Sequence, residues 1–256
     1  MPVVSKIEDC IIIGGGNSIK KAFSLGLGLR LQGKLVIACN YAFRHFEHTF
    51  LTFIDRDFYY PSQNAIVNKT HPNIYEELKT LPLIIGRNIN GVEEFKLPNT
   101  ILLNGNSVTY YREQALKKGF YTGNLTGIFA LSLATFLMNY NGIIYLLGFD
   151  WNRRKSEEVD RKNYSGQTDL QIHYYSKEEI NHQGCGKIGY YENHNPDNCF
   201  KPFIKERDVK IYNVSLESNI NCFEKISYEK MFTLLNKETY NQEELRKETK
   251  LMFTNK

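Results

Sequence analysis

Short apolar runs alternate with helix-like segments through the first 150 residues of the chain. The runs are rich in Ile, Leu and Val, they end at Gly, Asn or Asp, and they lie at residues 10–13, 35–39, 50–54, 83–85, 101–103 and 143–147, with a later one at 209–214. Near-continuous apolar strands are typical of parallel sheets that are covered on both faces. The pattern therefore predicts the α/β class: a Rossmann-like open, mostly parallel sheet with helices on both faces and a lid insertion.

Four parts of the chain differ in their pattern. Residues 1–151 predict a nucleotide-binding Rossmann-like core, in which the almost entirely apolar segment 127–138 is a helix packed on the centre of the sheet. Residues 152–198 are charged and rich in Tyr and His, and they are long for a loop, so we expect a lid or insertion there. Residues 199–225 return to the core with a helix and the last strand, and the Lys/Glu-rich residues 226–256 predict C-terminal surface helices.

Composition narrows the class of protein further. The 256 residues are 42% hydrophobic and 23% charged, which is typical of a folded chain, and the net charge of +4 is spread without a polybasic arm. The longest nearly apolar stretch, 125–138, is shorter than the ~20 residues of a membrane span. The N-terminus lacks the features of a signal peptide, and the five cysteines are an odd number. We therefore expect a cytoplasmic protein with reduced thiols and no transmembrane segment.

Three glycines follow the first apolar run and begin the first candidate site. Gly14, Gly15 and Gly16 allow a sharp turn and a close approach of the backbone to a ligand, while Asn17 and Ser18 can cap the next helix, whose free N–H groups attract phosphate. The dinucleotide fingerprint is absent, because Ile19 stands where its third glycine would be. The turn predicts a phosphate cradle, and an ordinary strand-to-helix turn is the alternative.

Other predicted strands also end in small polar residues. Because the carboxyl ends of parallel strands share one edge of the sheet, these residues should converge on one crevice. Each alone could merely cap a turn, but their repetition favours a polar ligand such as a nucleoside, whose ribose and base need both donors and acceptors. The residues are Asn40, Asp55, Asn104 and Asp150.

Two carboxylates lie close together after the third run. Asp55 and Asp57 could hold Mg²⁺ or Mn²⁺ against a diphosphate, provided that the chain turns between them, since alternating residues of an extended chain point in opposite directions. The alternative is a turn in which Arg56 is the partner of a carboxylate. A bound metal is therefore possible but is not required by the sequence.

A second place for an anionic group precedes the apolar helix. Asn124 or Thr126 would cap that helix, and Gly127 permits close approach of the backbone. Tight packing of the helix on the sheet is the alternative explanation for Gly127.

The predicted lid contains several histidines and tyrosines. His182, Cys185, His194 and Cys199 have the residue types of zinc ligands, but their spacing matches no common zinc finger, so chance placement is the better explanation. A lid histidine could instead be the general base for an acceptor hydroxyl, because imidazole titrates near neutral pH.

The order of these motifs resembles the bacterial lipooligosaccharide sialyltransferases and the related MptE-like 6-hydroxymethylpterin diphosphokinase superfamily. The resemblance extends over about residues 10–225 and consists of several short motifs. The Gly-x-Ser turn of the family is similar to Gly16-Asn17-Ser18, and its Cys-Asn pair is similar to Cys39-Asn40. The polar end of its third strand is similar to Asp55. Its turn before an apolar helix is similar to Leu125-Thr126-Gly127, and its Gly-x-Asp element is similar to Gly148-Phe149-Asp150.

The resemblance also implies catalytic residues. His194 is similar to the catalytic histidine that precedes the final helix and strand of the sialyltransferases, and residues 212–218 resemble their last strand and its Ser-containing turn. Those enzymes have a tyrosine after the Gly-x-Asp element, whereas this chain has Trp151 and Asn152, which leaves Tyr164 or a lid Lys or Arg as the substitute. With this departure, the resemblance implies a nucleotide-linked donor without specifying sialic acid as its sugar.

Three functions follow as hypotheses. The leading one is a glycosyltransferase that moves a sugar from a CMP-sugar-like donor to an acceptor hydroxyl, with His194 as general base and no required cofactor. The alternative is a diphosphokinase that transfers pyrophosphate from ATP, with Mg²⁺ on Asp55 and Asp57. The third is a non-catalytic nucleotide-binding module. The acceptor could be a glycan, a small molecule, a protein or a nucleobase, and the oligomeric state is not encoded in any recognisable pattern.

Overall fold

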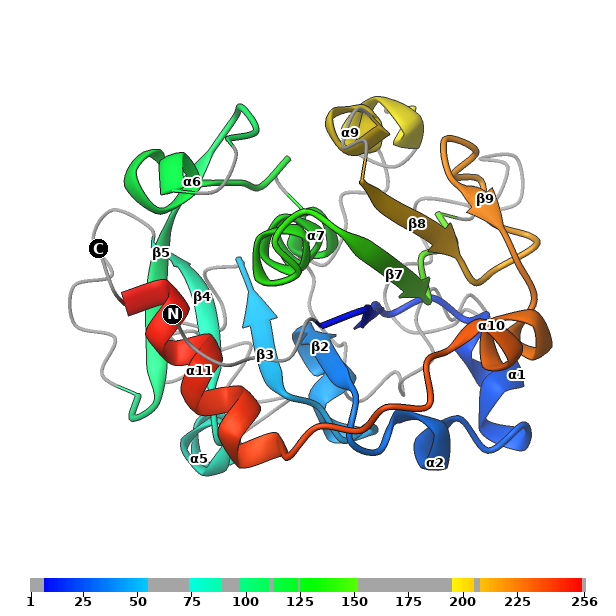
Figure 1. Cartoon of the computed structure of the whole chain (residues 1–256), viewed down its shortest axis with the longest axis horizontal. Coiled ribbons are helices and arrows are strands. Elements are labelled where there is room, and N and C mark those ends of the chain that lie inside the picture. The colour runs from blue at the N-terminus through cyan, green and yellow to red at the C-terminus, as the bar shows by residue number, and fades with distance from the viewer. Residues whose placement is uncertain are drawn as a thin grey trace, which may run out of the picture.

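The computed structural model describes residues 7–54, 74–88, 97–110, 113–123, 125–151, 195–204 and 208–254. Within these residues, nine strands form one sheet in the order β6-β5-β4-β3-β2-β1-β7-β8-β9, and every neighbouring pair is parallel (Figure 1). Their bounds are β1 Asp9–Ile13, β2 Leu35–Cys39, β3 Phe50–Phe53, β4 Ile84–Asn88, β5 Thr100–Asn106, β6 Phe120–Tyr121, β7 Gly142–Leu147, β8 Val209–Asn213 and β9 Glu224–Lys225. The predicted Rossmann-like α/β fold is confirmed.

Each predicted strand is present, with bounds that differ by a few residues. The two additional strands, β6 and β9, have two residues each and lie at the edges of the sheet. Strands that short have no hydrophobic periodicity, so sequence analysis does not predict them.

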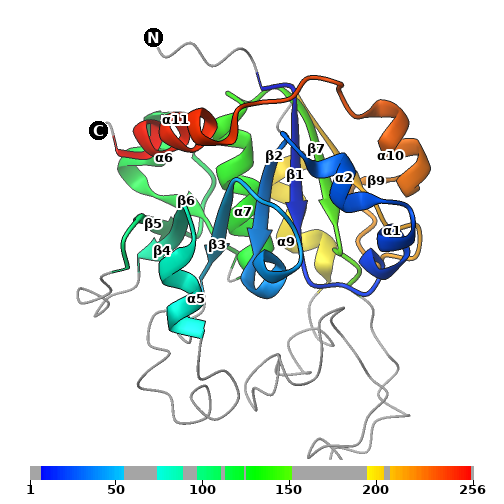
Figure 2. The same ribbon diagram turned by 90° about the horizontal axis from the view of Figure 1, so that it is seen from below.

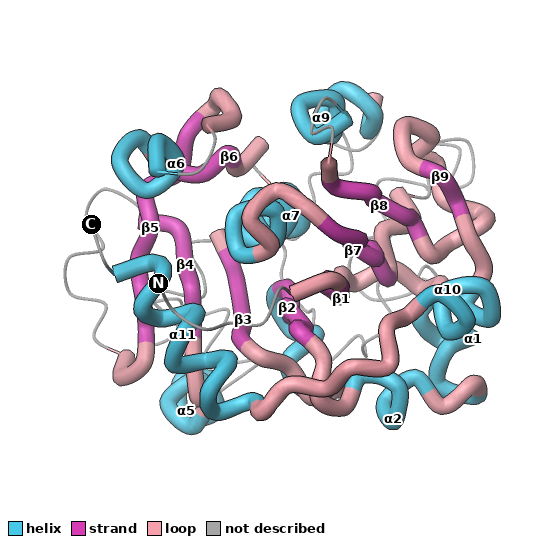
Figure 3. Tube along the Cα trace, viewed as in Figure 1, coloured by secondary structure: helices cyan, strands magenta, loops and turns pink. Residues whose placement is uncertain are grey.

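Helices cover both faces of the sheet (Figure 3). One core cluster joins the sheet to side chains of α6 (Glu113–Lys118), α7 (Thr126–Leu137), α9 (Pro196–Ile204) and α11 (Gln242–Thr254). The other cluster joins the opposite face to α1 (Ile19–Ser24), α2 (Leu27–Leu31), the 3₁₀ helix η1 (Asn40–Arg44), α5 (Ile74–Thr80) and α10 (Tyr228–Leu234). Alternate residues of the longer strands therefore enter two separate cores, as the apolar runs predict.

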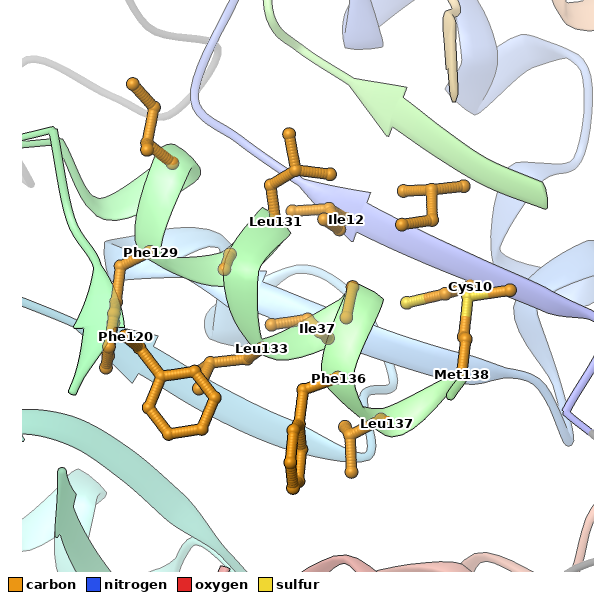
Figure 4. Packing of buried hydrophobic residues seen from close by; sticks show 14 of the residues in the cluster. Cys10, Ile12, Ile37, Phe120, Phe129, Leu131, Leu133, Phe136, Leu137 and Met138 are labelled. Atoms are coloured by element: carbon orange, nitrogen blue, oxygen red, sulfur yellow. The ribbon is translucent and has the colours of Figure 1, made fainter. Parts of the chain in front are cut away.

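Helix α7 is the central helix, and it packs against β1, β2 and β3. Its residues are buried almost all round, so the predicted core helix is confirmed, although it begins at Thr126. Figure 4 shows Leu131 of α7 and Met138, the residue that follows the helix, beside Ile12 and Cys10 of the sheet. This packing fixes where the first turn of α7 meets the ends of the strands.

The C-terminal residues form the expected helices and contribute to the cores. Helix α11 buries Leu245 and Phe253, and α10 buries Tyr228 and Met231. Figure 2 shows α11 across the amino ends of the strands, opposite the edge at which β1 and β7 end. Across the described residues, no helix is long and apolar enough to span a bilayer.

Most of the predicted lid lies outside the described residues. Only its last part, 195–198, is described, and α9 begins there at Pro196. The return to the core therefore begins a few residues before the predicted boundary at 199.

Candidate functional site

The candidate site lies where the strand order changes direction. From β1, the chain proceeds outward through β2 to β6 on one side, and it returns through α7 to β7 on the other side of β1. Ligands of open α/β sheets bind at the carboxyl ends of the strands at such a switch point. The segments that meet there are the turn after β1, the end of β2, the start of α7 and the turn after β7.

The glycine turn after β1 is paired with the turn after β7. The N–H of Gly14 donates to the Leu147 carbonyl and the N–H of Gly16 donates to the Gly148 carbonyl, both at 2.8 Å. A Cβ on Gly14 would lie 2.8 Å from the Gly148 oxygen, so the two backbones approach closely. The sequence predicts that these glycines admit a ligand, whereas the structure shows that Gly14 and Gly16 admit a neighbouring segment of the same chain.

The carboxylate of Asp150 lies at the end of this turn. Its Oδ2 accepts a hydrogen bond of 2.8 Å from the N–H of Ser18, the residue before α1, and Asp150 is 6% exposed. The Ser18 side chain does not cap α1, so the predicted local cap is replaced by a residue 132 positions away. A carboxylate is stabilised at this end of a helix because the helix dipole is positive there.

Tyr228 of α10 completes this cluster. Its phenol is buried beside Ser18 and Asp150, and burial together with the negative charge of Asp150 raises the pKa of Tyr228. The phenol therefore stays protonated at neutral pH. Sequence analysis does not identify Tyr228, because only the tertiary fold brings α10 to the turn after β1.

The last residue of β8 and the loop that follows it hold the turn after β7 in place. Asn213 Nδ2 and the Ser218 hydroxyl both donate to the Phe149 carbonyl, at 3.1 and 2.7 Å. The N–H of Asn219 donates to the Asp150 carbonyl at 2.8 Å, and its side-chain amide donates to the Trp151 carbonyl at 2.8 Å. Three consecutive carbonyls are thus fixed, and with them the position of the Asp150 side chain.

A second polar pair joins the end of β2 to the start of α7. The hydroxyl of Thr126 donates to Asn40 Oδ1 at 3.2 Å, and Asn40 has a left-handed φ of 51°, which asparagine tolerates better than most residues. The N–H groups of Ile128 and Phe129 donate to the Leu125 carbonyl. The preceding first-turn amides, those of Thr126 and Gly127, have no acceptor inside the helix.

The ring of Phe149 lies between the two polar clusters. A Cβ on Gly14 would be 3.1 Å from one edge of the ring, and a Cβ on Gly127 would be 2.5 Å from the other edge. Gly127 therefore serves the tight packing that sequence analysis gives as its alternative role. The Asp150 cluster and the Asn40–Thr126 pair are neighbours across one aromatic ring.

The structure brings together most, but not all, of the described candidate residues. One cluster contains Gly16, Ser18 and Asp150, with Gly15 and Asn17 in the same turn, and the other contains Asn40, Thr126 and Gly127. The prediction that Asn104 joins them is wrong, because β5 lies four strands from β1, about 19 Å at the usual strand spacing of about 4.8 Å. Its Oδ1 instead accepts a hydrogen bond from Asn88 at 3.1 Å.

The remaining candidates lie outside the described residues, namely Asp55, Asp57, Asn124, Tyr164 and His194. Within the described part of the chain, no three His, Cys, Asp or Glu side chains are grouped so that they could hold a metal ion.

The described site also contains residues that sequence analysis does not give as ligand-binding or catalytic, namely Phe149, Asn213, Ser218, Asn219 and Tyr228. Asn213 and Ser218 lie in the segment 212–218, whose resemblance to the last strand and Ser-containing turn of the sialyltransferases is the sequence signal for them.

Comparison of the chain with protein-family models, with curated proteins and with solved structures found no match.

Proposed function

We propose that this protein is a transferase that binds a nucleotide-activated sugar at the carboxyl ends of β1, β2 and β7 and passes the sugar to an acceptor hydroxyl. The observation that carries the proposal is the convergence of the Asp150 cluster and the Asn40–Thr126 pair across the Phe149 ring. This convergence occurs at the switch point, where open α/β sheets bind nucleotides.

The chemistry of the Asn40–Thr126 pair suits the nucleoside and its phosphate. The Asn40 amide offers both a donor and an acceptor, as the edge of a base or a ribose requires. The first-turn amides of α7 and the positive end of its dipole suit the adjacent phosphate.

The transfer step of the proposal depends on residues that the sequence alone identifies. His194 would remove the proton of the acceptor hydroxyl, and Tyr164 would assist the departing phosphate of a CMP-sugar-like donor. These roles come from the resemblance to the sialyltransferases, and in this mechanism no metal is needed.

Thermal unfolding in the presence of nucleotides tests the proposal. We expect CMP, UDP, GDP or one of their sugar conjugates to stabilise the protein without Mg²⁺. A ligand at a hundred times its Kd adds about 2.7 kcal/mol, or roughly 5–10 °C for a chain of this size. His194→Ala should then abolish sugar transfer while it preserves donor binding. Stabilisation by ATP alone, and only with Mg²⁺, would favour the diphosphokinase, and stabilisation by none of these ligands would refute the proposal.

A further inference from the structure

The turn after β1 has the form of a phosphate-binding turn, but its amides are already occupied. A strand, a run of glycines and a helix start normally present free N–H groups to an anion. Here the N–H groups of Gly14 and Gly16 donate to the carbonyls of Leu147 and Gly148, and the N–H of Ser18 donates to the Asp150 carboxylate. Three N–H donors that would bind a phosphate therefore already have acceptors, which lie at the end of β7 and in the turn after it.

The group that accepts the hydrogen bond from the Ser18 N–H is itself an anion, the Asp150 carboxylate. Asp150 Oδ2 takes the position that a phosphate oxygen would take, and Oδ1 is buried without a hydrogen-bond partner. The negative charge acts on its surroundings, since it contributes to the raised pKa of Tyr228. A second anion placed in this turn would meet a like charge in a poorly solvated environment, where charge repulsion is stronger than in water.

This carboxylate has little freedom to move out of the turn. The carbonyls of residues 149–151 are held by Asn213, Ser218 and Asn219. On the other side, a Cβ on Gly16 would lie 2.6 Å from Asp150 Oδ2, so the side chain packs directly on the Gly16 backbone. The Asp150 side chain is therefore packed into the turn by contacts on both sides.

We propose that Asp150 is a specificity-determining residue whose carboxylate keeps anionic groups out of the turn formed by Gly14, Gly16 and Ser18. This inference rests on the proposed function and refines it. In the nucleotide complex, the uncharged part of the ligand faces the glycine turn, and the phosphates lie toward the start of α7, on the other side of the Phe149 ring.

Replacement of the carboxylate by a small free anion tests this role. Asp150→Ala leaves the Ser18 N–H without its acceptor and opens a space the size of a carboxylate. Sodium formate should raise the Tm of this variant by about 3 °C more than sodium chloride of equal ionic strength, with no such difference for wild type. Asp197→Ala is the matched control, because the Asp197 carboxylate also accepts backbone N–H groups, from Asn221 and Cys222, but is more exposed to solvent than that of Asp150.

Asp150→Asn retains the shape of the side chain and removes only the charge. If the alanine variant does not fold, this variant tests whether the charge of Asp150 keeps anions out of the turn. Inorganic phosphate should raise its Tm by about 2 °C more than that of wild type. If formate and phosphate shift each Asp150 variant that folds no more than they shift wild type, the proposed role of Asp150 is wrong. Neither titration contains a nucleotide, so this result is distinct from a failure of the nucleotide panel, which would refute the proposed function.

Discussion

Substitution of Gly16 by alanine tests the packing on which the candidate site depends. The added Cβ would lie 2.6 Å from both Cγ and Oδ2 of Asp150 and 2.7 Å from the Gly148 oxygen. Two of these atoms belong to a side chain that is fixed by its bond to Ser18, and the third belongs to the backbone. Neither neighbour can give way without breaking hydrogen bonds between the turns after β1 and β7.

The expected cost is that of an overpacked core position, about 1–3 kcal/mol in the free energy of unfolding. For a chain of this length, that cost lowers the Tm by roughly 2–12 °C. Equilibrium unfolding in urea, followed by circular dichroism, measures the free energy directly, and the slope of the transition shows whether the unfolded state has changed.

Gly28→Ala is the control for Gly16→Ala. Gly28 lies in α2, and a Cβ there would meet no atom within 4 Å. Alanine at an exposed helical position should stabilise the protein by about 0.5–1 kcal/mol. If Gly16→Ala is as stable as wild type while Gly28→Ala behaves as expected, Asp150 does not pack on the glycine turn, and the described geometry of the site is wrong.

Three further predictions follow from single contacts. Ser218→Ala removes the hydroxyl that donates to the Phe149 carbonyl, so urea unfolding should show a loss of about 1–3 kcal/mol. Thr126→Val removes the hydrogen bond to Asn40 Oδ1, which is expected to contribute about 1 kcal/mol, so calorimetry should show about fivefold weaker binding of the nucleotide-sugar donor. Burial lowers the pKa of His48 below its usual 6.5, so the unfolded state gains the proton first, and stability should fall as the pH drops below about 6.5. His48→Gln should flatten that decline, whereas the exposed control His45→Gln should retain it.

The sequence predicts the sheet and its central helix well because both depend on local patterns. The apolar runs at β1, β2 and β7 have composition and length that specify buried strands, and the segment that forms α7 is apolar on all sides. The two-residue strands β6 and β9 depend on pairing with their neighbours, so no local pattern reveals them.

The candidate site is predicted only in part, because tertiary contacts decide the role of each residue. Asp150 follows a strand as expected, yet its carboxylate bonds to Ser18 within the same chain. Asn104 lies inside β5 and not after it, and this strand is too far from the switch point. Tyr228 has no sequence signature, because α10 reaches the site through the packing of Tyr228 and Met231 against the sheet.

Calorimetric titration of a matched pair of strand-end variants tests the central claim most directly. Asn40→Gly removes the side chain that accepts a hydrogen bond from the Thr126 hydroxyl, and glycine adopts the φ of 51° at this position without strain. Asn104→Ala removes the same type of side chain from β5. With the best-binding nucleotide of the thermal panel, we predict at least tenfold weaker affinity for Asn40→Gly and unchanged affinity for Asn104→Ala. Equal affinities for wild type and both variants would contradict the placement of the nucleotide at the ends of β1, β2 and β7.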